Sequence, residues 1–346
     1  MTTLPIVASG NRGMNPRRWL RALAIASVLA AGAVQAKDAT LLNVSYDVAR
    51  DVYKDLNPVF VAQQKAAGRT VVVEQSHGGS SKQARSVIDG LEADVVTMNN
   101  PLDIDQIARA GLLPADWAGR LPNHSAPSWS TILFLVRKGN PKGIRDWVDL
   151  VKPGVGVILP NPKTSGNGRY SYLAGWEWAR RQAGGSDRAG QDYVRKLFAN
   201  VPILDTGGRG ATTSFVQRGI GDVLLTFENE IGLLRAELGG ADYEVVVPSL
   251  TVRAHNPVAR VDKVAGRHGS TELVDAYLHF HYSEPAQAIF ARNHLRPVDA
   301  EVLRRHAGRF PAVEAFRVED AFGSWEAAQA RHFANGGVFD QIYAVR

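Results

Sequence analysis

Apolar, β-branched runs alternate with longer amphipathic segments along most of this chain, and this alternation restricts the fold more than any other feature. Several runs are too uniformly apolar to have one wet face, so we expect helices on both sides of each strand. Regular alternation of strands and helices predicts an α/β architecture with mainly parallel sheets. The expected strands are residues 41–45, 70–75, 93–98, 132–136, 155–159, 223–227 and 244–247.

The segments between these strands have the period of amphipathic helices. Pro58 interrupts an otherwise helical run, residues 49–67, so that helix is expected to kink or to split in two. Helix-rich sequence returns at residues 270–294 and 318–334. The clearest apolar stripe follows Ser81 and consists of Ala84, Val87, Ile88 and Leu91.

The first 36 residues have the features of an export signal. A basic segment precedes an apolar run, residues 22–34, and Val34-Gln35-Ala36 resembles a small-residue cleavage site. The apolar run is far shorter than the roughly 20 residues that span a bilayer. We therefore expect an exported mature chain that begins at Lys37. The basic residues of the signal are Arg12, Arg17, Arg18 and Arg21.

Composition narrows the class of protein further. The signal holds four of the 40 Lys and Arg residues and no Asp or Glu, which leaves 36 basic and 34 acidic residues in the mature chain, a net charge of +2. With so little charge and no basic run, we expect no nucleic-acid partner. Cysteine is absent, which excludes disulfides and thiolate metal sites. The mature length suits two domains better than one.

Three loops rich in glycine and hydroxyl residues stand at the start of helical segments. They are His-Gly-Gly-Ser-Ser-Lys at 77–82, Pro-Asn-Pro-Lys-Thr-Ser-Gly-Asn-Gly-Arg-Tyr at 160–170, and Asp-Thr-Gly-Gly-Arg-Gly at 205–210. A helix start leaves N–H groups unpaired and carries partial positive charge, and glycines let a ligand approach the backbone. In any one loop the hydroxyl would most simply cap its own helix. Three such loops favour a shared site for a small anion.

Motifs for other functions are missing. No loop has the spacing of a P-loop, and no G-x-G-x-x-G follows the first strand, so no nucleotide or other cofactor is expected. His279 and His281 alternate in a helix and would point to different faces, so no metal site is expected there. His77 could act as a base, although a structural bond to the backbone is the simpler role. Glu228 and Glu230 alone are weak signs of acid–base chemistry.

Long strings of residues then resemble the periplasmic sulfate- and thiosulfate-binding proteins of ABC importers. The resemblance implies a type II periplasmic-binding fold, in which two α/β lobes joined by two crossing segments close over an anion. Lobe I would comprise residues 37–130 and 247–346, and lobe II residues 131–246. The strings that carry the resemblance are Leu41–Asp47, Gln75–Ser80, Phe134–Pro141, Pro160–Lys163, Gly219–Leu224 and His332–Gly337.

The resemblance also implies a site made mostly of backbone N–H donors, with a serine hydroxyl at Ser165. Arg209 and His77 would support the site. Two positions depart from the sulfate-specific pattern: Phe227 stands where sulfate binders have tryptophan, and Asn167 where a second glycine is expected. At both positions the sequence resembles the thiosulfate-binding subgroup more than the sulfate-binding one. The anion-binding residues implied are Asp47, Ser80, Ser165, Gly166, Asn167, Gly208 and Phe227.

The function implied is capture of sulfate or thiosulfate in the periplasm, without chemistry, for delivery to a membrane permease and its ATPase. The protein would be a monomer without a cofactor. Asp47 would contribute its backbone N–H and turn its carboxylate elsewhere, so a donor-only pocket would reject protonated phosphate. The alternatives are an exported hydrolase of anionic esters, and a binding protein for another tetrahedral oxyanion such as molybdate or phosphate.

Overall fold

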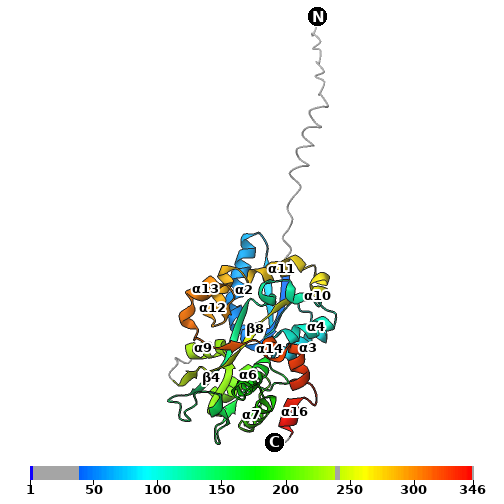
Figure 1. Ribbon diagram of the computed structural model, residues 1–346. Helices are drawn as coiled ribbons and strands as arrows, with labels where there is room; N and C mark the ends of the chain where they lie inside the picture. Colours follow the sequence, from blue (N-terminus) through cyan, green and yellow to red (C-terminus); the bar gives the residue numbers. More distant parts are fainter. Residues whose placement is uncertain (3–38, 238–241, 345–346) are drawn as a thin grey trace. The chain divides into compact units, whose positions relative to one another are not determined.

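The first of two sheets is built on three parallel strands, β1 (Ala39–Tyr46), β2 (Val71–Gly78) and β3 (Val95–Thr97), with β9 (Val258–Arg260) antiparallel at one edge (Figure 1). The structure is a computed structural model that describes residues 1–2, 39–237 and 242–344. Because parallel strands end at the same edge of a sheet, the loops that follow β1, β2 and β3 come together there.

The second sheet is organised around one long strand, β4 (Ser128–Arg137). The first half of β4 pairs antiparallel with β8 (Thr251–Asn256), and its second half pairs antiparallel with β6 (Val223–Phe227) and β7 (Tyr243–Val246). Among the described strands of this second sheet, the parallel pairs are β5 with β6 and β11 with β8. The expectation of mainly parallel sheets is therefore confirmed for the first sheet and wrong for the second. The short strands are β5 (Val157–Ile158), β10 (Arg296–Pro297) and β11 (Ala315–Phe316).

Helices surround both sheets (Figure 1). Those in the first two thirds of the chain are η1 (Asp47–Ala49), α2 (Arg50–Ala66), α3 (Ser80–Ile88), α4 (Pro101–Arg109), η2 (Trp117–Gly119), α5 (Pro122–Ser125), η3 (Trp147–Val151), α6 (Gly166–Gln182), α7 (Asp187–Ala199), α8 (Gly208–Val216) and α9 (Glu228–Glu237). The remainder are α10 (Asp262–His268), α11 (Thr271–Phe280), α12 (Glu284–Arg292), α13 (Ala300–Arg305), η4 (Ala307–Arg309), α14 (Val318–Phe322), α15 (Trp325–Ala328), η5 (Gln329–Phe333) and α16 (Val338–Tyr343).

Strand residues are buried on both faces of the sheets, as the apolar runs predict. Val95 and Val96 point to opposite faces of β3, and each belongs to a different hydrophobic cluster. In the second sheet Phe134 packs in the main cluster, whereas Leu133 and Leu135 pack with Phe215 on the other face. The expectation of helices on both sides of the strands is confirmed.

Helix α2 continues unbroken through Pro58, so the predicted split is wrong. Pro58 is exposed, whereas Leu56 and Phe60 on either side of it are fully buried. A proline on the wet face leaves its freed carbonyl partner open to water. The buried stripe then holds the helix together across the missing hydrogen bond.

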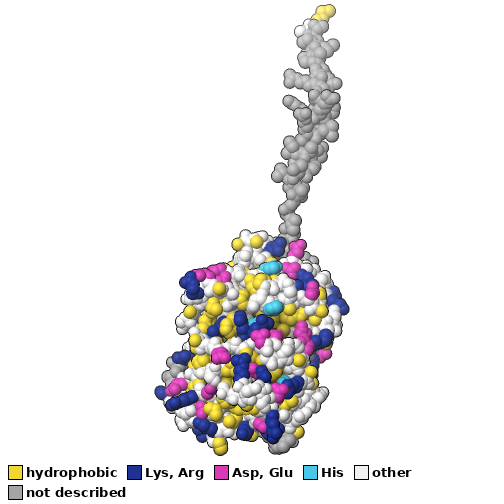
Figure 2. All heavy atoms as spheres, in the orientation of Figure 1, with side chains coloured by type: hydrophobic (Ala, Val, Ile, Leu, Met, Phe, Trp, Pro, Cys, Tyr) yellow, Lys and Arg dark blue, Asp and Glu magenta, His cyan; other side chains and the backbone are white. Residues whose placement is uncertain are grey.

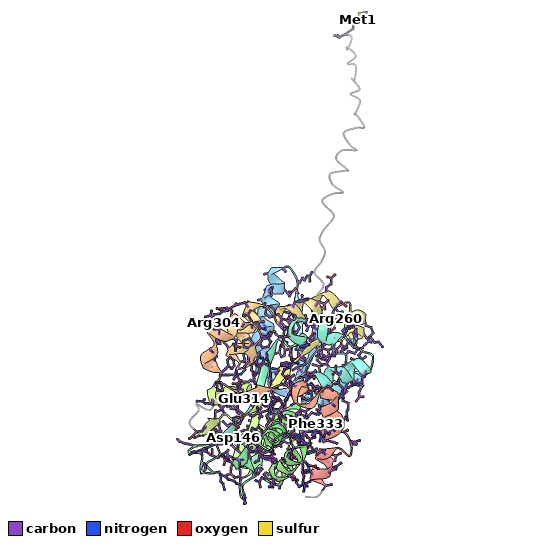
Figure 3. All side chains as sticks on the ribbon, in the orientation of Figure 1. Met1, Asp146, Arg260, Arg304, Glu314 and Phe333 are labelled. Carbon is purple, nitrogen blue, oxygen red and sulfur yellow. The ribbon has the colours of Figure 1, made fainter. Side chains whose placement is uncertain are left out.

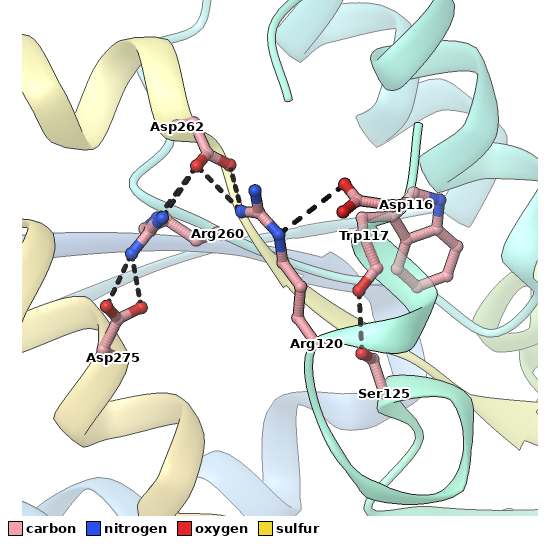
Figure 4. A network of polar contacts seen from close by, with 7 residues as sticks. All are labelled: Asp116, Trp117, Arg120, Ser125, Arg260, Asp262 and Asp275. Carbon is pink, nitrogen blue, oxygen red and sulfur yellow. Dashed lines mark hydrogen bonds and ion pairs between the residues drawn. The ribbon is translucent and has the colours of Figure 1, made fainter. Parts of the chain in front are cut away.

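Ion pairs connect segments that are far apart in the sequence. Arg120 donates to Asp262 at 2.8 and 3.0 Å, and Arg260 pairs with both Asp262 and Asp275 (Figure 4). Glu314, which lies ahead of β11, pairs with Arg181 of α6 at 3.4 Å (Figure 3). These contacts tie the later part of the chain to its earlier elements.

Basic and acidic side chains are interspersed on the face shown in Figure 2, which fits the small net charge of the mature sequence. Within the described ranges no helix is long and apolar enough to cross a bilayer. The predicted export signal, residues 1–36, lies outside the described residues apart from Met1 and Thr2.

Candidate anion site

Helices α3, α6 and α8 begin beside one another. A Cβ atom added to Gly79, just before α3, would lie 3.1 Å from the carbonyl oxygen of Thr164 and 3.6 Å from that of Thr206. Thr164 precedes α6, and Thr206 precedes α8. The structure therefore brings together the three glycine- and hydroxyl-rich loops found in the sequence.

The N-cap residues of these three helices are Gly79, Ser165 and Gly207, and none of the three caps its helix through its own side chain. In α8 the carboxylate of Asp47 accepts from the N–H of Arg209 in the first turn. The neighbouring α4 differs, because Asn100 accepts from the backbone N–H of Asp103 at 3.1 Å. Ser165 therefore does not cap α6, which would be the simplest role for the hydroxyl of any one loop. Three helix starts with partial positive charge converge here without a protein group to satisfy them all.

Asp47 follows β1 and connects the first sheet to the start of α8. Its carboxylate accepts from the backbone N–H of Val48 at 3.1 Å and from that of Arg209 at 3.2 Å. Burial raises the pKa of Asp47, and the two N–H groups oppose that shift. A Cβ on Gly207 would lie 2.8 Å from the carboxylate, so glycine is required for this approach. The carboxylate is thus held by backbone donors.

Ser80, at the start of α3, is bound to a buried carboxylate. Its hydroxyl donates to Asp103 at 2.5 Å, and Ser81 donates to the other oxygen of the same carboxylate at 3.0 Å. Arg169 of α6 completes the cluster with an ion pair to Asp103 at 3.3 Å. Sequence reasoning missed Asp103 and Arg169. The Asn100-Pro101 pair, a signature of a helix start, was the available signal for this cluster.

Gly166 and Asn167 open α6 and contact different parts of the site. A Cβ on Gly166 would overlap with the amide of Asn99, which follows β3. The Asn167 side chain donates to the hydroxyl of Thr226 at 2.9 Å. A Cβ on Gly208 would lie 3.4 Å from the same Asn167 nitrogen. The side chain of Asn167 is therefore bonded to Thr226, whereas its backbone belongs to the first turn of α6.

Glu230 lies beneath α8 and is fully buried. Its two carboxylate oxygens accept from the hydroxyl of Thr212 at 2.6 Å and that of Thr226 at 2.5 Å. Burial raises the pKa of Glu230. Glu228 instead forms a bidentate ion pair with Arg296 at 2.6 and 2.8 Å. The two glutamates have separate partners and do not form a catalytic pair.

Phe227 ends β6 and is buried. Its ring packs edge-on against Tyr170 of α6, with the ring centres 6.0 Å apart. Side chains of successive strand residues point to opposite faces, and the neighbouring Thr226 points toward Asn167 and Glu230. The structure therefore places Phe227 beside the first turns of α6, with an apolar ring and no N–H to donate.

The two predicted supporting residues have identifiable partners. Arg209 forms an ion pair with Asp51 of α2. His77, at the end of β2, bonds to the hydroxyl of Ser45 at 2.7 Å, so the expected bond to the backbone is wrong. Burial lowers the pKa of His77 to about 4, and the imidazole is therefore neutral near pH 7.

A cavity of about 470 Å³ opens outside these helix starts. Asp47 and Arg209 reach it, whereas Ser80, Ser165 and Asn167 lie buried deeper. Basic residues at its mouth are Lys82, Arg85 and Lys163. Lys163 is paired with Asp340 at 2.9 Å. Buried Arg169 is paired with Asp103, and partly exposed Arg209 is paired with Asp51. The positive potential at the site therefore comes from the backbone dipoles and from the basic residues at the mouth.

The part of the chain that the structure describes contains no group of three or more His, Asp or Glu residues placed to hold a metal ion. His279 is exposed and His281 is fully buried, in line with the prediction that the two point to different faces. His281 bonds to the carbonyl oxygen of Tyr277 at 2.7 Å and to the hydroxyl of Tyr53 at 3.1 Å.

Residues 41–296 match the family described as bacterial extracellular solute-binding protein, and the chain belongs to this family. The predicted fold class, a type II periplasmic-binding fold of two α/β lobes, is confirmed. The sulfate-binding protein SubI from Mycobacterium tuberculosis, a solved structure, is 34% identical, with a TM-score of 0.76 over 84% of this chain and 98% of that one.

Curated relatives narrow the comparison to one branch of the family. The chain is 53% identical to the thiosulfate-binding protein of Pseudomonas aeruginosa, over 95% of this chain and 99% of the relative. It is 52% identical to the sulfate-binding protein of Escherichia coli, over 91% and 96% of the two chains. The predicted membership of the sulfate- and thiosulfate-binding proteins is confirmed.

Proposed function

We propose that this protein binds sulfate or thiosulfate reversibly at the starts of α3, α6 and α8 and delivers the anion to an ABC importer. The observation that carries the proposal is the convergence of three helix N-termini whose N-cap residues supply no capping side chain. The names of the relatives, sulfate- and thiosulfate-binding protein, support the same ligand class. The proposed ligand residues are Asp47, Ser80, Ser165, Gly166, Asn167 and Gly208.

A dianion would be held by hydrogen bonds and dipoles, since partly exposed Arg209 and buried Arg169 are already paired with Asp51 and Asp103. Charge-assisted hydrogen bonds contribute roughly 1.5–3 kcal/mol each, so six contribute roughly 9–18 kcal/mol in total. Association costs about 4–15 kcal/mol. Micromolar affinity, about −8 kcal/mol, falls within the difference.

Selectivity against phosphate would follow from the donors. The oxygens of Asp47 already accept from the N–H groups of Val48 and Arg209. These bonds orient that carboxylate toward backbone donors, and the proposal requires that it accept no proton of the ligand. A protonated phosphate would bury a hydroxyl without a partner, which costs about 1–3 kcal/mol or more.

Closure would involve two lobes, residues 37–130 with 247–346 and residues 131–246. Asp47 and Ser80 would belong to lobe I, and Ser165 to Asn167, Gly208 and Phe227 to lobe II. A dianion that contacts both lobes stabilises the closed arrangement. In this arrangement the bond from Arg209 to Asp47 and the ion pair between Arg209 and Asp51 run between the lobes.

Phe227 would bias the site toward thiosulfate. An indole at this position could donate to an oxygen of sulfate, whereas a phenyl ring offers only apolar surface. The terminal sulfur of thiosulfate is larger and more weakly hydrated than an oxygen, so it suits that surface better. The proposal predicts that thiosulfate displaces sulfate when both are present at equal concentration.

The remaining parts of the proposal concern the setting. The protein would act in the periplasm as a monomer, without catalysing a reaction, and would present its closed form to a permease with a cytoplasmic ATPase. The separate partners of Glu228 and Glu230 support a role without chemistry.

Calorimetric titration of the mature protein, freed of anions by refolding, tests the proposal with sulfate, thiosulfate and phosphate. We expect micromolar or tighter binding of at least one sulfur anion and no response to phosphate. Absence of binding by both sulfur anions would contradict the function. Tight phosphate binding would contradict the donor-only site.

A further inference from the structure

A second cavity, of about 640 Å³, shares no lining residue with the cavity at the three helix starts. Helix α9 and strand β7 form one side, and the chain from residue 294 to 311 forms the other. Pockets of about 300–1,000 Å³ accommodate small organic ligands. The apolar residues that line it are Leu133, Ile231, Ala236, Val245, Val247, Ala307, Phe310 and Pro311.

One carboxylate lines this cavity, and it is already neutralised. Glu228 holds Arg296 through two bonds of 2.6 and 2.8 Å. Arg296 also donates to the carbonyl oxygen of Pro311 at 2.7 Å, and its guanidinium lies 5.1 Å from the centre of the Phe310 ring. This buried ion pair fixes one wall of the cavity and leaves no free negative charge there.

Three other groups at the cavity are cationic or can become so: Arg235, Arg309 and His294. Among the residues that the structure describes, neither Arg235 nor Arg309 forms an ion pair. Burial, followed by the charges of Arg309 and Arg235, lowers the pKa of His294. The two guanidinium groups therefore act on the same imidazole, and the cavity carries an excess of positive charge.

The imidazole of His294 is held in place by backbone features on both sides. His294 has φ of +59°, a left-handed conformation that costs a non-glycine residue energy. A Cβ on Gly232 of α9 would overlap with the His294 ring, so the ring lies against the backbone of that helix. The ring and the helix are thus in direct contact at the cavity wall.

We propose that this cavity is an accessory binding site for a small organic anion that has an acidic head group and a hydrocarbon body. The head group contacts Arg235, Arg309 and His294, and the body packs against Leu133, Ile231 and Phe310. An inorganic dianion leaves the apolar wall uncovered, and an organic cation meets like charge. The site is separate from the proposed sulfur-anion site and does not depend on its ligand.

Octanoate is a suitable probe, with octylammonium as the probe of opposite charge and equal length. Calorimetry should detect octanoate binding at concentrations up to about 1 mM and weaker or no binding of octylammonium. Titration of the histidine ring protons by NMR should show a higher pKa for His294 when octanoate is bound, because an anion favours the charged imidazole. No octanoate binding at that concentration, or equal binding of both probes, would overturn the proposal.

Charge-reversed variants locate the binding. The double variant Arg235→Glu, Arg309→Glu should weaken octanoate binding by about tenfold or more. Arg188→Glu, at an exposed arginine of α7, should leave it unchanged. Ala236→Trp, which fills the cavity without changing charge, should also weaken binding. An octanoate affinity that is the same in all variants would show that octanoate binds non-specifically elsewhere, and this result would overturn the proposal.

The sulfate and thiosulfate affinities of the same variants separate this proposal from the proposed function. They should match the wild-type values, since none of these residues lines the helix starts. Loss of octanoate binding with sulfur-anion binding retained supports the accessory site alone. Retained octanoate binding in a protein that binds no sulfur anion would contradict only the proposed function.

Discussion

At the scale of single residues, a comparison of Ser165 with Ser186 distinguishes a ligand-binding hydroxyl from a structural one. Ser165 occupies an N-cap position without capping its helix, whereas Ser186 caps α7 by accepting from the N–H of Ala189 at 3.4 Å. The two serines have equivalent positions in their helices, so the same substitution at each is a matched pair.

Ser165→Ala should weaken sulfur-anion binding by roughly tenfold to a hundredfold, the value of one charge-assisted hydrogen bond. Its free energy of unfolding should change little, because no cap bond is lost. Ser186→Ala should show the reverse: a loss of about 1 kcal/mol in stability and unchanged anion affinity. Calorimetry and urea unfolding measure the two effects. Equal stability losses in both variants would assign Ser165 to the helix and not to the ligand.

Phe227→Trp tests the ligand preference. A new indole N–H should shift the ratio of sulfate to thiosulfate affinity toward sulfate by about tenfold. The larger ring must fit beside Tyr170, so stability should fall by about 1–3 kcal/mol. Phe227→Leu, which also lacks a donor, is the control for altered packing. An affinity ratio that is the same in all three proteins would remove Phe227 from the site.

Single residues of the site could be predicted from the sequence where backbone chemistry decides their role. The glycines at 79, 166 and 208 stand where side chains or carbonyl groups approach closely, and their loops meet as predicted. The bonds from Ser80 to Asp103 and from Thr212 to Glu230 could not be predicted, because each joins residues more than ten positions apart. Nothing local to a carboxylate identifies the distant hydroxyl that will reach it.

At the scale of secondary-structure elements, two glycines within helices have opposite surroundings. A Cβ on Gly168, in the first turn of α6, would overlap with the carbonyl oxygen of Pro160. A Cβ on Gly266, within α10, would meet no atom within 4 Å. Gly168 is needed because the loop before α6 packs against its Cα, whereas packing does not require a glycine at position 266.

Gly168→Ala should lower the free energy of unfolding by more than about 1 kcal/mol, because rigid backbone must move. It should also weaken sulfur-anion binding, since the displaced loop leads directly into Ser165. Gly266→Ala should raise stability by about 0.4–1 kcal/mol and leave binding unchanged. Urea unfolding and calorimetry on both variants provide the comparison. A neutral Gly168→Ala would show that the loop before α6 adapts readily.

Elements were predictable where a strand is buried on both faces, as β1, β3 and β6 are. β8 carries polar residues such as Arg253 and His255, and β9 has only three residues, so the apolar pattern did not mark them. The antiparallel pairing of β4 could not be predicted either, because the direction of a partner strand depends on contacts between distant parts of the chain. For β4 these are the contacts between residues 128–131 and 253–256.

At the scale of the whole molecule, buried neutral histidines make stability depend on pH. Burial lowers the pKa of His281 from 6.5 to about 4. On acidification the unfolded chain therefore binds a proton at His281, whereas the folded protein keeps this imidazole neutral. The free energy of unfolding falls as the pH drops below 6.5. His332, with a pKa lowered to about 4, and His255, lowered to about 3, act in the same direction.

His281 alone should account for a loss of about 2 kcal/mol between pH 7 and pH 5. His281→Gln should be less stable at pH 7, because it loses the bond from Tyr53, yet its stability should fall less over this pH range. Urea unfolding at both pH values gives the comparison, with exposed His279→Gln as the control. An undiminished pH dependence in His281→Gln would contradict a neutral, buried role for this residue.

The position of β9 has a consequence for how the chain is made. This strand, residues 258–260, completes a sheet whose other strands lie between residues 39 and 97. A nascent chain therefore cannot finish its first sheet until three quarters of its length has left the ribosome. Contacts of such sequence separation form slowly. We expect this delay to keep the newly made polypeptide unfolded for longer, which suits the passage through a secretion channel that the predicted export signal implies.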